Sequence, residues 1–275
     1  MTRELILGAV AYDPKVVPIW EGFKAFFEAA GLPFDFVLYS NYERQVEAHL
    51  RGDIDVAWSS PLAWIEAERA ARARGRRAEA IAMRDTDRDL TSVVLVRADG
   101  PIRDAADLHG KRIAVGASDS PQATLIPLVA LAEAGAEGTV LRHDVFVGKH
   151  GDHVGGERNA VKALLAGDAD AACVIDGNRL AFVREGLIPG SSVRVVLQTA
   201  PYDHCNFTIL DGGPPSIARF CELLLAMSYD DPALRPLLDM EGLRQWLPGR
   251  TTGYALLERA VDRYGTIEPW LARLR

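Results

Sequence analysis

Strand-like and helix-like segments alternate along this sequence, and that alternation restricts the fold more than any other feature. A buried strand over residues 4–10 precedes a segment with apolar residues at helical spacing, which stops at Gly31. The strand "FDFVLYS", the helix "NYERQVEAHLRGD" and the strand "IDVAW" follow. Because a helix between two strands lets the chain run in the same direction twice, the pattern predicts an α/β protein with a largely parallel sheet.

The stretch "WSSPLAW" places two hydroxyl groups where a buried strand ends and a helix begins. Ser60 is the predicted N-cap of this helix and Pro61 its first residue, as Asn41 is the predicted N-cap of the helix that ends before Gly52. Ligands of open α/β sheets bind beyond the carboxyl ends of strands, where helix N-termini present free N–H groups. Ser59 and Ser60 are therefore candidate ligand contacts, and the alternative is that they serve capping and solvation only.

Two distant stretches share one pattern, a helix followed by Gly-Asp, a second Asp and a small apolar strand. They are "EAHLRGDIDVAW" near residue 50 and "KALLAGDADAACV" near residue 168. Two lobes of similar α/β design would produce such a pattern. The last third of the chain reads as mainly helical.

Charge and cysteine usage exclude several classes of function. The formal net charge of -7 argues against a nucleic-acid or membrane-surface partner. The three cysteines, Cys173, Cys205 and Cys221, lie far apart, show no zinc spacing and form no disulfide framework. No apolar run approaches the length that membrane insertion needs. The sequence predicts no cofactor, and no residue is assigned as a metal ligand.

The first residues of the sequence are compatible with two cellular compartments. "MTRELILGAV" has no charged n-region, long apolar stretch or small-residue cleavage site. A protein that begins at Met1 is expected to be cytoplasmic, whereas a trimmed chain is expected to be a mature periplasmic or other extracytoplasmic protein.

Several stretches together resemble a known family. They are "NYERQVEAHLRGDIDVAWSSPLAWIEA", "TSVVLVRADGPIRDAADLHGKRIAVG", "SPQATLIPLVAL", "NAVKALLAGDADAACVID" and "QTAPYDHCNF". In order and spacing, over roughly residues 4–245, the chain resembles the type 2 periplasmic-binding-protein fold and, within it, the phosphate/phosphonate substrate-binding proteins of ABC importers. The resemblance implies two α/β lobes, residues 1–90 plus 205–275 and residues 91–204, with two crossing strands and the ligand in a central cleft.

The resemblance also assigns candidate ligand contacts. Tyr42 falls where the family has a ligand-facing tyrosine, Ser120 aligns with a serine of its anion-binding loop, and Gln122 replaces a usual hydroxyl. His204 and Cys205 lie on the second crossing, where hinge packing is the alternative. The full predicted set is Tyr12, Tyr42, Ser59, Ser60, Ser120, Gln122, Thr124, Glu157, Asp176, His204 and Cys205.

One departure from the family concerns charge. Glu157 stands where related proteins tend to have a histidine, and Asp176 matches the family's acidic residue nearby. Two carboxylates beside a dianionic phosphonate would repel it. We therefore expect a zwitterionic, cationic or neutral polar ligand.

His150, His153, His204 and Cys205 raise the separate question of a metal, because histidine and cysteine bind zinc or iron. Solvent-exposed or ligand-contacting histidines are the alternatives, and the sequence leaves the question open.

Three functions follow from these observations. The first is a non-catalytic solute-binding protein whose lobes close on a small polar molecule, with an ABC importer permease as partner. The second is a cytosolic enzyme of small-molecule or cofactor biosynthesis on the same fold, although no catalytic motif is present. The third is a ligand-sensing subunit.

Overall fold

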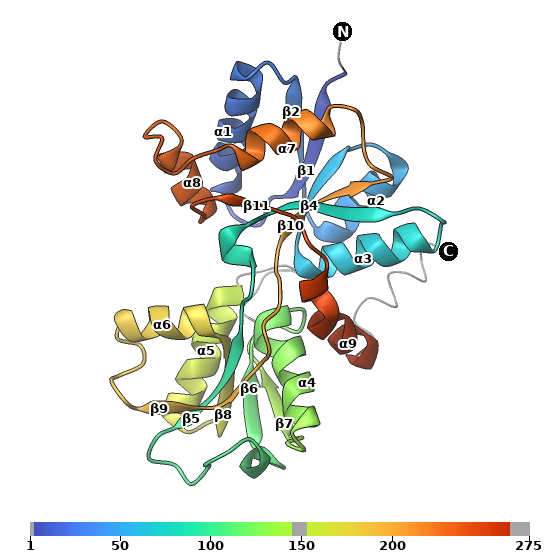
Figure 1. Ribbon diagram of the computed structural model, residues 1–275. Coiled ribbons are helices and arrows are strands. Elements are labelled where there is room, and N and C mark those ends of the chain that lie inside the picture. The colour runs from blue at the N-terminus through green and yellow to red at the C-terminus, as the bar shows by residue number, and fades with distance from the viewer. Residues whose placement is uncertain (1–2, 145–152, 265–275) are drawn as a thin grey trace. The chain divides into compact units, whose positions relative to one another are not determined.

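The computed structural model describes residues 3–144 and 153–264. The chain divides into two compact units, each with its own sheet and helices (Figure 1). Among the described residues, unit 1 holds 3–88 and 203–254, and unit 2 holds the rest. The predicted α/β architecture in two parts is confirmed.

Unit 1 has, in its described part, one six-stranded sheet with helices on both faces. In order across the sheet the strands are β11 (Trp246–Pro248), β4 (Ala78–Arg84), β10 (Asn206–Leu210), β3 (Val56–Ser59), β1 (Leu5–Val10) and β2 (Phe34–Tyr39). The helices are α1 (Val16–Ala29), α2 (Tyr42–Arg51), α3 (Pro61–Arg72), α7 (Ile217–Leu225) and α8 (Arg235–Glu241), with short 3-10 turns at Asp85–Asp87 and Thr252–Tyr254.

The core of unit 1 lies mainly between the sheet and the helices α1, α7 and α8. Phe23 and Phe27 of α1 contact Trp246 and Phe220, and Phe207 of β10 packs edge-on against Phe220. Aromatic side chains of this size dominate the energetics of burial. On the other face, apolar residues of α2 and α3 form a second cluster beside the end of β1.

Unit 2 has, in its described part, a five-stranded sheet. In order the strands are β7 (Thr139–Arg142), β6 (Arg112–Val115), β8 (Ala171–Ile175), β5 (Ser92–Arg97) and β9 (Val193–Gln198). The helices are α4 (Ile126–Glu133), α5 (His153–Ala166), α6 (Asp176–Arg184) and α9 (Ala255–Tyr264), with a 3-10 turn at Ala106–Leu108 and a π-helical turn at Pro121–Leu125 directly before α4.

Alternate residues of β5 show why helices cover both faces of this sheet. Val93 and Leu95 pack in the cluster that includes α5 and α6, whereas Val94 and Val96 pack in the cluster that includes α4. A strand buried on both faces reads as a continuous apolar run, as "SVVLV" does.

The prediction of a largely parallel sheet is wrong, because both sheets are mixed. Each contains a parallel trio, β2-β1-β3 in unit 1 and β7-β6-β8 in unit 2. Beside each trio lies an antiparallel strand, β10 on β3 and β5 on β8. These two strands follow the points where the chain passes from one unit to the other, at residues 88–89 and 202–203. Each lies beside a trio that the strand-helix-strand connections of its own unit form.

Predicted helix boundaries in unit 1 are confirmed. The side chain of Asn41 accepts a hydrogen bond from the backbone N–H of Arg44 at 2.9 Å, and Gly52 ends α2 with a φ of 81°. The hydroxyl of Ser60 accepts from the N–H of Ala63 at 3.3 Å at the start of α3.

The last described helix, α9, groups with unit 2, whereas the sequence analysis placed residues 205–275 in the first lobe. Arg259 lies 3.7 Å from Glu133 and Arg263 lies 2.8 Å from Glu137, next to α4. Exposed ion pairs of this kind contribute little, so the packing of α9 against α4 holds the helix there.

Candidate functional site

Polar side chains gather in unit 1 where its parallel strands end. Tyr12 follows β1, Tyr42 follows β2 and Ser60 follows β3. The antiparallel strand β10 begins at the same edge, because Asn206 lies opposite Ser59. Below, the unit 1 edge means Tyr12, Tyr42, Ser60, Arg84, Asp87, His204, Cys205 and Glu241.

The hydroxyl groups at this edge differ in their surroundings. Tyr12 is 51% exposed, whereas Tyr42 is buried, and burial raises the pKa of Tyr42 well above its usual value. Tyr42 is therefore a neutral phenol at neutral pH. The buried hydroxyl of Ser59 accepts a hydrogen bond from Thr208 at 2.8 Å inside the unit. The Ser59 hydroxyl thus links β3 to β10 inside unit 1, and Ser59 is not among the proposed solute contacts.

A half-buried arginine joins two carboxylates at the unit 1 edge. Arg84 donates to both oxygens of Asp87, at 2.5 Å from Nε and 3.0 Å from Nη2. Its Nη1 donates to Oε1 of Glu241 at 3.2 Å and to the backbone carbonyl oxygen of Glu241 at 2.8 Å. The guanidinium also lies over the ring of Trp58, 5.1 Å from the centroid. Arg84 is therefore held in one orientation, with its charge already matched.

The two carboxylates respond differently to the same arginine. Burial alone would raise the pKa of Asp87, but Arg84 and His204 outweigh it and lower that pKa to about 2. Burial raises the pKa of Glu241 to about 7, because its single contact with Arg84 offsets only part of the desolvation. Asp87 is thus always ionised near neutral pH, whereas Glu241 can take up a proton.

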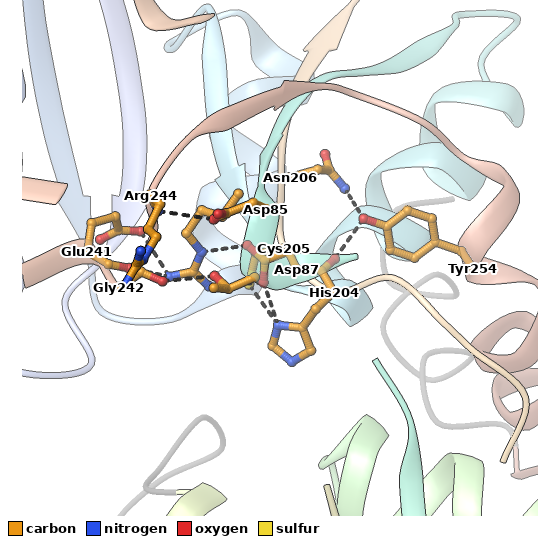
Figure 2. Close-up of polar contacts among 11 residues, drawn as sticks. Asp85, Asp87, His204, Cys205, Asn206, Glu241, Gly242, Arg244 and Tyr254 are labelled. Atoms are coloured by element: carbon orange, nitrogen blue, oxygen red, sulfur yellow. Dashed lines mark hydrogen bonds and ion pairs between the residues drawn. The ribbon is translucent and has the colours of Figure 1, made fainter. Parts of the chain in front are cut away.

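His204 and Cys205 meet Asp87 through a single nitrogen. Nδ1 of His204 lies 3.4 Å from Oδ1 of Asp87 and 3.2 Å from Sγ of Cys205, and its other nitrogen points away from the cluster (Figure 2). Burial raises the pKa of Cys205 well above its usual value, so its sulfur is a thiol. A Cys-His-Asp relay needs a thiolate and separate nitrogens for its two partners, so this geometry does not support nucleophilic catalysis.

Backbone contacts fix the position of His204. Its N–H donates to the carbonyl of Asp87 at 2.8 Å, and its own carbonyl accepts from the hydroxyl of Tyr254 at 2.7 Å. Asn206 donates to the same tyrosine oxygen at 2.8 Å (Figure 2).

Unit 2 has a corresponding edge, where β6 and β8 end. The hydroxyl of Ser120 accepts from the N–H of Ala123 at 3.2 Å, and Thr124 donates to the carbonyl of Ala117 at 2.7 Å. Both hydroxyls support the turn that opens the helical run at Pro121. Below, the unit 2 edge means Ser120, Gln122, Thr124, Glu157, Asp176 and Tyr202.

Gln122 differs from its neighbours in this turn. It is buried, and its side-chain oxygen has no hydrogen-bond partner among the described residues. Its backbone carbonyl accepts from the hydroxyl of Ser92 at 2.5 Å, and that hydroxyl lies 2.7 Å from the Tyr202 oxygen. A buried amide oxygen needs a donor, which a bound polar molecule would supply.

The two predicted carboxylates of unit 2 have partners within the unit. Glu157 is buried, and its Oε2 accepts from the N–H of Ile175 at 2.9 Å and from Asn178 at 3.0 Å. Asp176 begins α6 and accepts from Nε of Arg179 at 2.6 Å. These contacts offset part of the negative charge that the sequence analysis assigned to this edge.

A pocket of about 430 Å³ lies elsewhere on unit 2. It is lined by apolar residues of α4, β6 and β7 together with Arg142, Arg263 and Tyr264. Thr124 lines it, but the other predicted residues of the described unit 2 do not. This pocket is therefore not the site that the predicted contacts define, although it is large enough to hold a small molecule.

Two candidate metal ligands cannot be placed. His150 and the side chain of His153 lie outside the described residues.

In the described ranges, no helix combines the length and the apolar character needed to cross a bilayer.

Sequence and structure comparisons place the chain in a family. The family of periplasmic substrate-binding proteins of phosphonate ABC transporters matches residues 11–254. Similar solved structures include PhnD1 from Prochlorococcus marinus in complex with methylphosphonate, with 18% identity, a TM-score of 0.66, and coverage of 96% of this chain and 98% of that one. XAC2383 from Xanthomonas citri bound to ATP has 18% identity, a TM-score of 0.71 and coverage of 96% and 100%. The aliphatic sulphonate binding protein SsuA from Escherichia coli has 18% identity, a TM-score of 0.58 and coverage of 98% and 89%.

At such identities the solved structures show the fold alone, and the family match over most of the chain gives the assignment. The expected resemblance is confirmed, and the chain belongs to the phosphonate family of ABC transporter periplasmic substrate-binding proteins.

Proposed function

We propose that this protein acts in the periplasm and delivers a small polar solute to an ABC importer permease. The observation that carries the proposal is the family match over residues 11–254, because that family consists of periplasmic substrate-binding proteins. A single nitrogen of His204 faces both Asp87 and Cys205, so these residues do not form a catalytic relay, which is consistent with binding rather than catalysis. The enzyme and sensor alternatives gain no support from the described residues.

We infer that polar groups at the ends of the parallel strands hold the solute. Such positions combine free N–H groups at helix N-termini with side chains that strand ends bring together. Gln122 adds a buried side-chain oxygen to which a bound solute could donate a hydrogen bond. The proposed contacts are Tyr12, Tyr42, Ser60, His204 and Cys205 in unit 1, and Ser120, Gln122, Thr124, Glu157 and Asp176 in unit 2.

The charges at the two edges favour a solute that carries an ammonium group as well as an anionic group. The positive charge of Arg84 is already matched by Asp87 and Glu241. Glu157 is a buried carboxylate, and its Oε2 accepts from the N–H groups of Ile175 and Asn178. Because two carboxylates share the single guanidinium of Arg84, a purely dianionic solute would be repelled at the unit 1 edge, whereas an ammonium group would be attracted.

Calorimetric titration with matched pairs of solutes tests both parts of the proposal. Aminomethylphosphonate and methylphosphonate differ only by an amino group, as do 2-aminoethanesulfonate and ethanesulfonate. We expect the amino compound of at least one pair to bind at least ~10-fold more tightly, which corresponds to about 1.4 kcal/mol. Tighter binding of methylphosphonate would contradict the inferred solute class. Failure of all four to bind at millimolar concentration would contradict both the class and the proposed site.

A further inference from the structure

Three side chains at the unit 1 edge carry the donor atoms that zinc prefers. Asp87 offers a carboxylate oxygen, His204 an imidazole nitrogen and Cys205 a sulfur, and these atoms all lie within 4.8 Å of one another. They come from two segments, the turn after β4 and the residues before β10, which the hydrogen bond from the His204 N–H to the Asp87 carbonyl joins.

Two of the three distances between these atoms approach those of a tetrahedral site. Zinc bonds of about 2.0–2.3 Å at tetrahedral angles place neighbouring ligand atoms roughly 3.4–3.6 Å apart. Nδ1 of His204 is 3.4 Å from the Asp87 oxygen and 3.2 Å from the Cys205 sulfur. An ion in front of this nitrogen would therefore need only small side-chain shifts to reach all three ligands.

The surroundings supply what a metal site needs besides ligands. Arg84 donates to both oxygens of Asp87 and so fixes the carboxylate, as outer partners of metal ligands commonly do. Zinc binding would release the thiol proton of Cys205, and the divalent cation neutralises the thiolate that forms beside the Asp87 carboxylate. The side chain of His204 is 21% exposed, which gives the ion a route from solvent.

We propose that Asp87, His204 and Cys205 form a Zn²⁺ site in unit 1. Three protein ligands leave the fourth tetrahedral position open to water or to an anionic group. The site assigns a cation to this chain, and it shares His204 and Cys205 with the proposed solute contacts of unit 1.

The test is titration of untagged, chelator-treated protein with ZnCl₂, followed by calorimetry. We expect about one Zn²⁺ per chain, and Cys205→Ser should weaken binding at least ~10-fold. The matched control is Cys173→Ser, a buried cysteine in β8 of unit 2, which should leave the affinity unchanged. Circular dichroism of each variant checks that it folds.

Cobalt supplies a second, spectroscopic readout of the same site. Co²⁺ bound to the wild-type protein should give the near-ultraviolet charge-transfer band of a cobalt–thiolate bond, and His204→Gln should reduce it. Absence of zinc binding at millimolar concentration, or cobalt binding without a thiolate band, would overturn the site. Zinc binding that Cys205→Ser leaves intact but the pair His150→Gln and His153→Gln abolishes would also overturn it.

Discussion

The carboxylates of Asp55 and Asp170 make the same contact in the two units. Oδ2 of Asp55 accepts the backbone N–H of Ile6 at 2.9 Å, and Oδ2 of Asp170 accepts that of Arg112 at 2.9 Å. In each case the aspartate N–H donates to the carbonyl of the same partner residue at 2.8 Å. The side chain therefore ties the loop before one parallel strand to the start of its neighbour.

The glycines of the repeated pattern are equivalent as well. Gly52 and Gly167 both end their helices in the left-handed region, with φ of 81° and 83°. Residues with a Cβ are strained in that region, which explains why the pattern needs glycine there. The internal similarity seen in the sequence thus corresponds to one repeated helix-to-strand connection.

Asp55→Ala and Asp170→Ala should each destabilise the protein by about 1.5–3 kcal/mol, the range for hydrogen bonds to charged groups. The reason is that each leaves a strand N–H without its charged acceptor. Urea denaturation at neutral pH measures the effect. The matched control is Asp53→Ala, because the Asp53 side chain is 52% exposed and the change should cost less than ~0.5 kcal/mol. Equal costs for Asp53→Ala and Asp55→Ala would contradict this account.

Arg84→Met should destabilise the protein by about 3–5 kcal/mol, because Asp87 would remain buried without its cation. Adding Asp87→Asn and Glu241→Gln should recover part of the loss by removing the unmatched charges. Thermal and urea unfolding provide the comparison. Arg72→Met is the control, since Arg72 forms an exposed pair with Glu68 and contributes little. A triple variant less stable than Arg84→Met would show that charge compensation is not the cause.

Much of the fold could be predicted from local patterns. Apolar periodicity located the three parallel strands of unit 1, and cap residues such as Asn41 and Ser60 located helix starts. Strand β4 was missed because its alternating alanines carry almost no apolar signal, and β11 because it is three residues long. The antiparallel pairs were missed because pairing depends on where the chain crosses between units, which local patterns do not encode.

The candidate site was harder to predict than the fold. His204 and Cys205 stood out as residue types, but their neighbours Arg84 and Glu241 did not. Arg84 ends the missed strand, and Glu241 is 157 residues away in sequence. No local pattern joins such positions. Glu157 likewise accepts from residues 18 and 21 positions away, whereas the pair of Asp176 and Arg179 follows the i,i+3 spacing of a helix and is a local pattern.

Acid should destabilise the protein through His49 in α2. Burial lowers the pKa of His49 from 6.5 to about 4. Between these values the unfolded chain binds a proton that the folded chain does not, so stability is full above pH 6.5 and falls as the pH drops towards 4. The loss from this group is of the order of 3 kcal/mol.

His49→Gln should remove this contribution, so the variant should lose about 2–3 kcal/mol less than wild type between pH 7 and pH 4. Urea denaturation across that range gives both slopes. The control is His109→Gln, because His109 is exposed and its removal should leave the wild-type slope unchanged. Parallel slopes for wild type and His49→Gln would refute the assignment.

Asp176→Ala should affect amino-bearing and purely anionic solutes in opposite directions. Removing the carboxylate takes a charged acceptor from an ammonium group, which should weaken binding of an amino-bearing solute by about 1.5–3 kcal/mol. It also releases Arg179, whose Nε now lies 2.6 Å from Asp176, so an anionic solute such as methylphosphonate should bind as well or better. Calorimetry with the two solutes on wild type and variant measures the sign of each change.

The matched control is Glu185→Ala, which breaks the ion pair with Arg158 in the same unit, because neither of these two residues is a proposed solute contact. It removes a carboxylate and releases an arginine, as Asp176→Ala does, but it should leave both affinities unchanged. An unchanged affinity for the amino-bearing solute in Asp176→Ala would make Asp176 a structural residue of α6. Equal changes for both solutes would show instead that the substitution disturbs the unit 2 edge as a whole, because a charge effect must distinguish a cation from an anion.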